Sequence, residues 1–119
     1  MTGFVDLVGS RRPISLTPAN TNEATLMTAG KERPTVVEIW ITNLTGSAAN
    51  ATVKWGNGSA DYSLIDTMSI AARTYHKVDV LIPLREAYTI KVTSGTGNAL
   101  TFTIIIVEYG SKLGAEHGG

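Results

Sequence analysis

Apolar and polar residues alternate along several segments of this chain, with the two-residue period of a β-strand. Ile39 and Ile41 share one face with Val37 in segment 35–42, and Val53 shares a face with Trp55 further along. β-branched and aromatic residues, which fit the pleated surface of a sheet, are frequent in these segments. The pattern predicts strands over residues 35–42, 51–55, 76–82, 88–93 and 100–109, the last apolar on both faces towards its end.

Weaker strand patterns occur at residues 14–17, 23–28 and 63–70. Turn-forming residues separate the segments at 45–47, 56–59 and 94–98, and the last of these clusters predicts a hairpin between two strong strands. The best helical stretch, residues 69–77, is equally compatible with a strand. Short strands between turns predict an all-β fold, an antiparallel β-sandwich of jelly-roll or Ig-like type with about eight strands.

The inward-facing apolar positions of the strong segments predict the buried core. A chain of 119 residues, 43% of them hydrophobic, is long enough for one such core and too short for two. The predicted core residues are Val37, Ile39, Ile41, Val53, Val78, Val80, Ile90, Val92, Phe102 and Ile104.

The two ends of the chain differ from its strand-rich middle. We divide it into an N-terminal arm over residues 1–12, a β-sandwich over 13–110 and a polar, Gly-rich tail over 111–119 that we expect to be flexible. Large apolar side chains in the arm precede the first strand pattern, so we expect them to dock on their own domain or on a neighbouring subunit. The candidate subunit-contact residues of the arm are Phe4, Val5, Leu7, Val8, Arg11 and Arg12.

Charge and composition exclude several kinds of partner. Ten basic residues balance ten acidic ones, so no overall charge attracts nucleic acid or anionic lipid. The longest aliphatic run, residues 104–107, is too short to span a bilayer as a helix, and no signal-peptide pattern occurs at the N-terminus. We therefore expect no membrane partner and no direct binding of nucleic acid.

The residues give no catalytic or cofactor pattern. The chain has no Cys, which removes disulfides and thiolate chemistry, and no Ser lies in a nucleophile elbow. His76 and His117 are far apart in the sequence, and a structural role is the more frequent one for such residues. Asp61 and Asp66 would offer calcium oxygen ligands, but their spacing does not match an EF-hand and turn residues of this kind are usually solvated. We predict no enzyme, no cofactor and no metal.

Two segments resemble small β-sandwich structural proteins of tailed bacteriophages. In residues 36–53 a strand ends in an Asn-rich turn with small residues and a short Thr/Val strand follows. In residues 98–110 Asn-Ala-Leu-Thr precedes a final apolar strand. The resemblance covers residues 14–110 and brings no catalytic residues with it. It implies a virion protein made in the host cytoplasm, a capsid decoration, neck or tail component that binds other virion proteins and copies of itself.

A carbohydrate-binding β-sandwich module is the alternative function. Such modules stack sugar rings on exposed aromatic side chains and bind hydroxyl groups with nearby polar residues. Trp40, Trp55 or Tyr62 would form the platform here, with Asp61 or Asn57 as hydrogen-bond partner. The genes on either side separate the two hypotheses: portal, capsid or tail genes would support the virion protein, and glycosidase genes the carbohydrate-binding module.

Overall fold

The computed structural model describes residues 11–108, which form eight β-strands and no helix. The all-β prediction is confirmed, and the ambiguous stretch 69–77 contains the end of one strand, a turn and the start of the next. The strands are β1 (Arg11–Leu16), β2 (Ala24–Thr28), β3 (Thr35–Asn43), β4 (Ala49–Gly56), β5 (Asp61–Ile70), β6 (Tyr75–Pro83), β7 (Thr89–Ser94) and β8 (Leu100–Val107).

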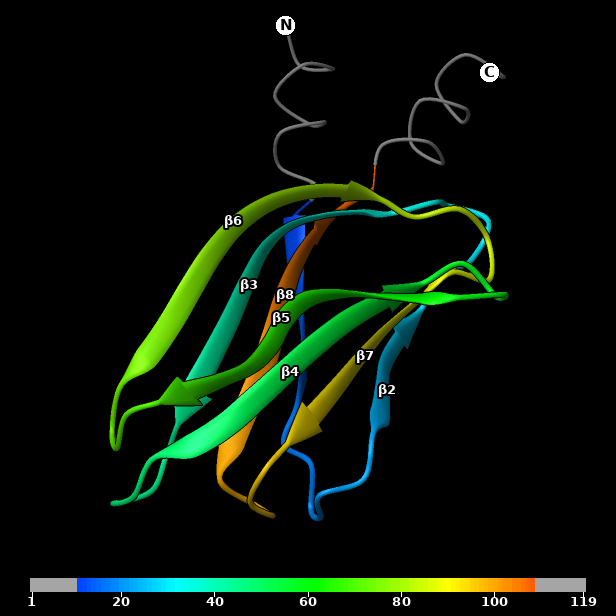
Figure 1. Ribbon diagram of the computed structural model, residues 1–119. Coiled ribbons are helices and arrows are strands. Elements are labelled where there is room, and N and C mark those ends of the chain that lie inside the picture. The colour runs from blue at the N-terminus through cyan, green and yellow to red at the C-terminus, as the bar shows by residue number, and fades with distance from the viewer. Residues whose placement is uncertain (1–10, 109–119) are drawn as a thin grey trace, which may run out of the picture.

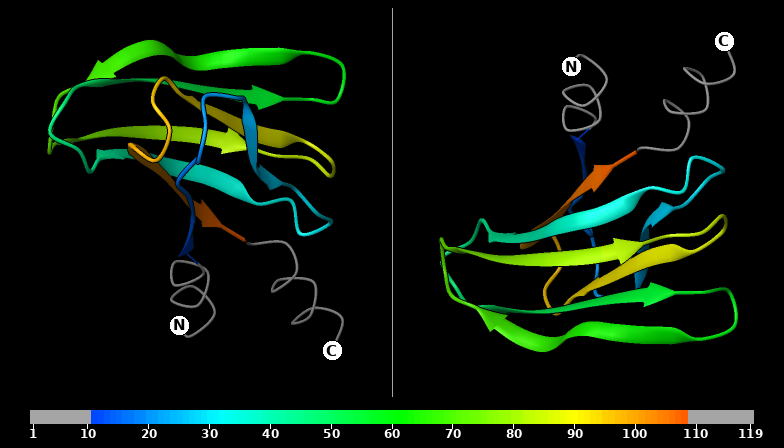
Figure 2. Two further views of the ribbon diagram at one scale, coloured as in Figure 1. Left: turned by 90° about the horizontal axis from the view of Figure 1, so that it is seen from below. Right: turned by 90° about the horizontal axis from the view of Figure 1, so that it is seen from above.

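These strands form two antiparallel sheets of four strands that stack as two layers (Figures 1 and 2). One sheet has the order β1-β8-β3-β6 and the other β2-β7-β4-β5. The chain therefore pairs from its ends inwards: β1 with β8, β2 with β7, β3 with β6 and β4 with β5. This is a long hairpin rolled up until β3 meets β8 and β4 meets β7, the topology of a jelly roll.

The turn clusters mostly carry the chain from one sheet to the other. Among the described strands, only β4 and β5 are consecutive in sequence and paired with each other. The predicted hairpin at residues 94–98 is wrong, because β7 and β8 belong to different sheets. That loop packs closely on the β1–β2 connection: a Cβ atom on Gly97 would lie 2.5 Å from the carbonyl oxygen of Ala19.

The two sheets enclose one apolar core, to which β8 contributes most. Phe102, Ile104 and Ile106 are all fully buried on its inner face, and Val107 is buried at the end of the strand. Seven of the predicted core residues are buried: Ile39, Ile41, Val53, Ile90, Val92, Phe102 and Ile104. Leu84 and Leu100, in or next to connecting loops, complete the core although alternation within the strong segments did not single them out.

Val37 is only half-buried, so its assignment to the core is wrong. The register of β3 shifts between Val36 and Glu38 against both of its neighbours, and Val37 has no partner in either pair. Such a bulge shifts the alternation by one residue. Val36 and Ile39 therefore both face the core, although they lie three positions apart, and they are 0% and 1% exposed.

Val78 and Val80 point towards the core as predicted, but they are half-buried and not largely buried. Their strand, β6, is the outermost strand of its sheet, with β3 on one side only. An edge strand lacks the second neighbour that would cover its inner side chains from the flank. Alternation identified the face of these residues, and the position of the strand in the sheet decided their exposure.

Asn43 joins three segments beneath the β3–β4 turn. The side chain is 1% exposed, and its amide nitrogen donates to the carbonyl oxygens of Ser47 at 2.8 Å and Ile70 at 3.0 Å. Its amide oxygen accepts from the backbone N–H of Thr45 at 2.9 Å and from the Thr45 hydroxyl at 2.8 Å. Both donors and both acceptor positions of the amide are used, so this buried polar group is fully paired.

The bulge makes Val36 and Val37 a matched pair for testing the phase of β3. We expect Val36→Ala to lower the free energy of unfolding by about 2 kcal/mol or more, because it removes buried methyl groups and leaves a cavity. Val37→Ala should cost less than about 1 kcal/mol, since that side chain is already partly exposed to solvent. Denaturant unfolding of both variants measures the difference, and equal losses would show that β3 has no bulge here.

Loss of the Asn43 amide should destabilise the whole domain. We expect Asn43→Ala to lower the free energy of unfolding by about 2–4 kcal/mol, because the carbonyl groups of Ser47 and Ile70 lose their donor in a buried place. Asn50→Ala is the matched control on exposed β4 surface and should change stability by no more than about 0.5 kcal/mol. Thermal and denaturant unfolding give both values, and a neutral Asn43→Ala would contradict the role of the amide.

Candidate interaction surface

The two arginines of the predicted arm are the first two residues of β1. Arg12 donates to both carboxylate oxygens of Glu108, from Nε at 3.1 Å and from Nη2 at 3.3 Å. This hydrogen-bonded contact and the charge of Glu108 raise the pKa of Arg12 above its ordinary value. Arg11 lies 3.9 Å from Glu38. Both guanidinium groups thus hold the start of β1 against its own sheet, and the other candidate contact residues, Phe4, Val5, Leu7 and Val8, lie outside the described residues.

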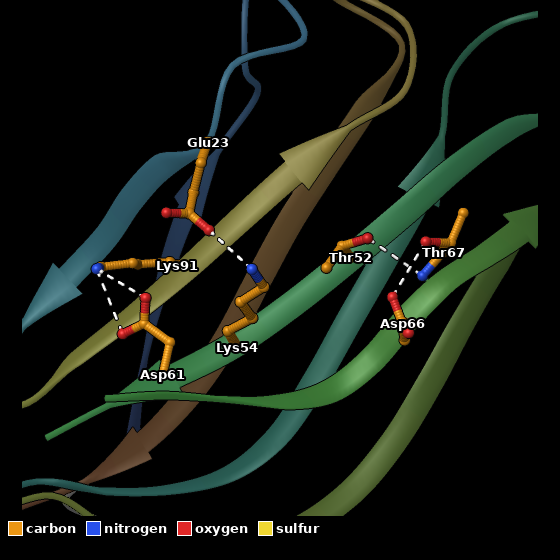
Figure 3. A network of polar contacts seen from close by, with 7 residues as sticks. All are labelled: Glu23, Thr52, Lys54, Asp61, Asp66, Thr67 and Lys91. Atoms are coloured by element: carbon orange, nitrogen blue, oxygen red, sulfur yellow. Dashed lines mark hydrogen bonds and ion pairs between the residues drawn. The ribbon is translucent and has the colours of Figure 1, made fainter. Parts of the chain in front are cut away.

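Asp61 and Asp66 do not converge on a common point. They belong to a network of polar contacts over β4, β5 and β7 (Figure 3). The carboxylate of Asp61 contacts the Lys91 ammonium group at 3.2 Å, whereas Asp66 accepts a hydrogen bond from the Thr67 hydroxyl at 3.1 Å. Within residues 11–108 no group of three or more His, Asp or Glu side chains lies close enough to hold a metal ion.

A shallow hollow of about 310 Å³ lies beside the Asp61–Lys91 ion pair, bounded by Thr89 and the tip of the β4–β5 hairpin. A Cβ atom on Gly56 would lie 2.4 Å from Oδ1 of Asp61 and 2.9 Å from the Thr89 hydroxyl, so glycine is required for these side chains to approach. Every buried side-chain nitrogen and oxygen atom of the described chain has a hydrogen-bond partner. No buried unpaired side-chain atom therefore lines the hollow and points to a ligand.

The aromatic residues near this hollow face the other way. Trp55 stacks on Tyr62 at 4.8 Å between ring centroids and on Tyr88 at 5.9 Å. Its register partner on β7, Ile90, is fully buried, so Trp55 lies on the inner face of its sheet. Asp61 contacts Lys91 on the outer face. The proposed sugar platform and its proposed polar partner therefore lie on opposite sides of the sheet.

Trp40 lies on the outer face of the β1-β8-β3-β6 sheet, where other side chains already cover it. Its indole Nε1–H donates to Glu38 at 2.8 Å, and the Lys77 ammonium group lies 5.5 Å from the ring centroid. The Tyr75 ring contacts it at 5.3 Å between centroids. Trp40 is half-buried under these groups and does not present an open ring face.

The outer side of β6 carries two of the four large hydrophobic side chains that are exposed within residues 11–108. Tyr75 is 62% exposed and Leu81 is 76% exposed, with Lys77 and Asp79 between them. Beyond the Tyr75 end, an open hollow of about 330 Å³ is bounded by Leu44, which is 59% exposed, and by Arg73. We call Tyr75, Lys77, Asp79 and Leu81 the β6 strip. Sequence reasoning assigned only the inner face of this segment and missed that its outer face combines apolar ends with opposite charges.

Within residues 11–108 no helix is long and apolar enough to cross a membrane. No protein-family model and no curated protein matches the sequence. Similarity is therefore found at the level of the fold.

Solved structures share that fold at low sequence identity. The capsid structure of Helicobacter pylori bacteriophage KHP30 has a TM-score of 0.55 at 6% identity, over 83% of this chain and 86% of that chain. A protein of Bacillus endospore appendages, from a family of disulfide-linked pili, has a TM-score of 0.52 at 17% identity, over 82% and 84% of the two chains. A pentameric capsid protein from metagenomic phage sequences has a TM-score of 0.48 at 13% identity, over 87% and 68%. The first two establish that this jelly-roll fold occurs in a phage capsid structure and in a pilus family.

Proposed function

We propose that this chain is a non-enzymatic structural protein of a bacteriophage virion, a capsid decoration protein or another accessory component of head, neck or tail. It acts through surface contacts with other virion proteins and with copies of itself, and its place is the virion. The observation that carries the proposal is the β6 strip, an exposed row of apolar and oppositely charged side chains along the edge of a jelly-roll sandwich. Exposed apolar rows beside an unpaired strand edge are typical of surfaces that bind other proteins.

Two further observations support an assembly role. The jelly roll is a fold of viral capsid domains, and two solved structures similar to this chain with TM-scores above 0.5 belong to a phage capsid and to a pilus family. Several polar side chains of the described residues are engaged with one another in ion pairs and turns, as with Asp61 and Lys91. A protein that works by contact needs a stable surface of this kind and no convergent reactive groups.

The same geometry disfavours the carbohydrate-binding alternative. Stacking on a sugar needs an open aromatic face with hydrogen-bond partners on the same surface. Trp40 is covered by Lys77, while Trp55 and Asp61 lie on opposite faces of their sheet. Tyr62, the remaining aromatic candidate, is 46% exposed, but one face of its ring is stacked on Trp55.

The virion role is tested by the composition of particles. Phage particles purified from a culture that carries the gene should contain the protein in fixed stoichiometry to the major capsid or tail protein, as measured by quantitative mass spectrometry. Particles from a deletion mutant, complemented or not with the gene, are the control. Recovery of the protein only in the particle-free fraction would refute the proposal.

The N-terminal arm should be required for attachment to the particle and dispensable for folding. β1 begins at Arg11, so deletion of residues 1–10 leaves all eight strands intact. We expect the truncated chain to keep its circular dichroism spectrum and to lose co-sedimentation with particles. A full-length variant with Phe4, Val5, Leu7 and Val8 replaced by Ser is the length-matched control and should behave in the same way. Normal attachment of both variants would show that the contact surface lies elsewhere. Unfolding of the truncated chain would show that the arm belongs to the core of its own domain.

A further inference from the structure

Strand β6 offers an unused row of backbone hydrogen-bonding groups. Among the described strands it pairs with β3 alone, and no other strand lies beyond it (Figure 1). The N–H of Asn43 donates to the carbonyl of Thr74 at 2.8 Å, and the N–H of Leu84 donates to the carbonyl of Pro34 at 2.9 Å. In an antiparallel ladder, residues alternate between facing the partner strand and facing away. Both bonds involve even-numbered residues next to or within β6, so the residues whose backbone groups face the open side are Tyr75, Lys77, Asp79 and Leu81.

The residues with free backbone groups are thus the β6 strip itself. The two apolar side chains, Tyr75 and Leu81, stand at its ends and are 62% and 76% exposed. Lys77 and Asp79 stand between them with opposite charges, their side chains 3.4 Å apart. Pro83 follows on the same side, and because proline has no N–H it ends the row of donors. The strip is a short, bounded edge on which one further strand can be added.

The order of side chains in the strip is complementary to itself when reversed. Antiparallel pairing of β6 with β6 of a second copy requires a two-fold axis, and at least three of the four strip residues are paired only when that axis passes Lys77, Val78 or Asp79. An axis at Lys77 or at Asp79 sets two like charges directly opposite each other, which is unfavourable. An axis at Val78 sets Lys77 opposite Asp79 of the second copy and Tyr75 opposite Leu81, and each of these contacts occurs twice.

We propose that two copies of this chain associate through their β6 strands, antiparallel and with the two-fold axis at Val78. The two four-stranded sheets then form one continuous sheet, and Tyr75 and Leu81 leave solvent together. On the inner side, the half-buried Val78 meets its own copy, which supplies the flank cover that an edge strand lacks. This dimer is the contact between copies that the proposed function includes, and its biological setting rests on that function.

The ion pairs of Lys77 within one copy can be exchanged for an ion pair with the second copy. Lys77 lies 3.4 Å from Asp79 and 4.0 Å from Glu38, with side-chain exposures of 38% for Lys77 and 78% for Asp79. Ion pairs this exposed contribute little to stability, so Lys77 does not lose much when it turns towards a second carboxylate. The side chain most exposed to solvent, Asp79, is the one that the second copy would cover.

Charge-reversal variants distinguish this register from nonspecific association. Lys77→Asp sets two aspartates opposite each other on both sides of the axis, and Asp79→Lys does the same with lysines. We expect each single variant to weaken association by about tenfold or more, since two favourable pairs become repulsive. The double variant Lys77→Asp with Asp79→Lys restores opposite charges across the seam and should recover association to within about threefold of the wild type.

Sedimentation velocity over a concentration series measures this association on the purified full-length chain. Lys31→Asp, in the exposed turn after β2, is the control with the same change of net charge as Lys77→Asp and should associate like the wild type. Circular dichroism of each variant reports the fold. A monomeric wild type at all concentrations, single variants that associate normally, or a folded double variant that stays monomeric would each overturn the proposal. Association that depends on residues 1–10 and ignores both charge reversals would also overturn it, because the arm and not β6 would then be the partner.

A cysteine placed at the axis tests the register without relying on charge. The chain has no native Cys, so a single substitution gives one defined thiol. In Val78→Cys the two thiols face each other across a non-hydrogen-bonded pair, where Cα atoms lie about 4.5 Å apart and a disulfide can form. Val80→Cys is the matched control on the same half-buried face, with its two thiols about 13 Å apart along the strands.

We expect mild oxidation to convert Val78→Cys into a covalent dimer on non-reducing gels and to leave Val80→Cys monomeric. Equal cross-linking of both variants, or none in Val78→Cys while the chain self-associates, would refute the axis at Val78. Both experiments use the isolated protein. A failure here with particle attachment intact refutes the β6 pairing alone, whereas absence of the protein from particles refutes the virion role alone.

Discussion

The last strand of the domain, β8, pairs with β1 on one side and with β3 on the other, and the remaining structure depends on this position. Its inner side chains Phe102, Ile104 and Ile106 are fully buried and form the middle of the core. Because the chain pairs from its ends inwards, β8 brings the first strand into contact with the last and itself lies in the interior of its sheet, beside β3. Pairing between distant segments has a high cost in chain entropy, and the continuous apolar character of β8 offsets it.

The same pairing scheme decides which strands become edges. With β7 and β8 in the interior of their sheets beside β4 and β3, the outer positions fall to β1, β2, β5 and β6. β2 is short and has a register shift, and β5 has two shifts against β4, with Thr67 at a positive φ of 53°. Irregularities of this kind discourage the addition of another strand. β6 has one register shift against β3, but it keeps an unbroken alternation of exposed and half-buried residues over nine positions, which makes it the edge best suited to binding.

Contacts outside the strand pairs hold the loops that connect the two sheets. Asn43 ties the β3–β4 turn to the end of β5 through four hydrogen bonds, and Gly97 allows the β7–β8 loop to lie against the β1–β2 connection. The Asn43 contacts lie at the tip of the sandwich where β3 ends and β6 begins, and where Leu44 and Tyr75 are exposed. The surface that we assign to binding is thus positioned by buried polar contacts, whose geometry is more specific than that of the apolar core.

Local periodicity was sufficient to predict the strands and most of the core, because alternation depends only on neighbouring residues. Ile39, Phe102 and Ile104 were identified in this way, and the absence of convergent reactive residue types in the sequence argued against an enzyme. The choice of jelly roll over Ig-like sandwich, the two-sheet course of the loop after β7, and the bulge at Val37 depend on pairing between segments far apart in sequence, which alternation does not encode. The candidate binding surface was missed for the same reason: Tyr75, Lys77, Asp79 and Leu81 are an ordinary outer strand face until the topology leaves β6 without a second neighbour.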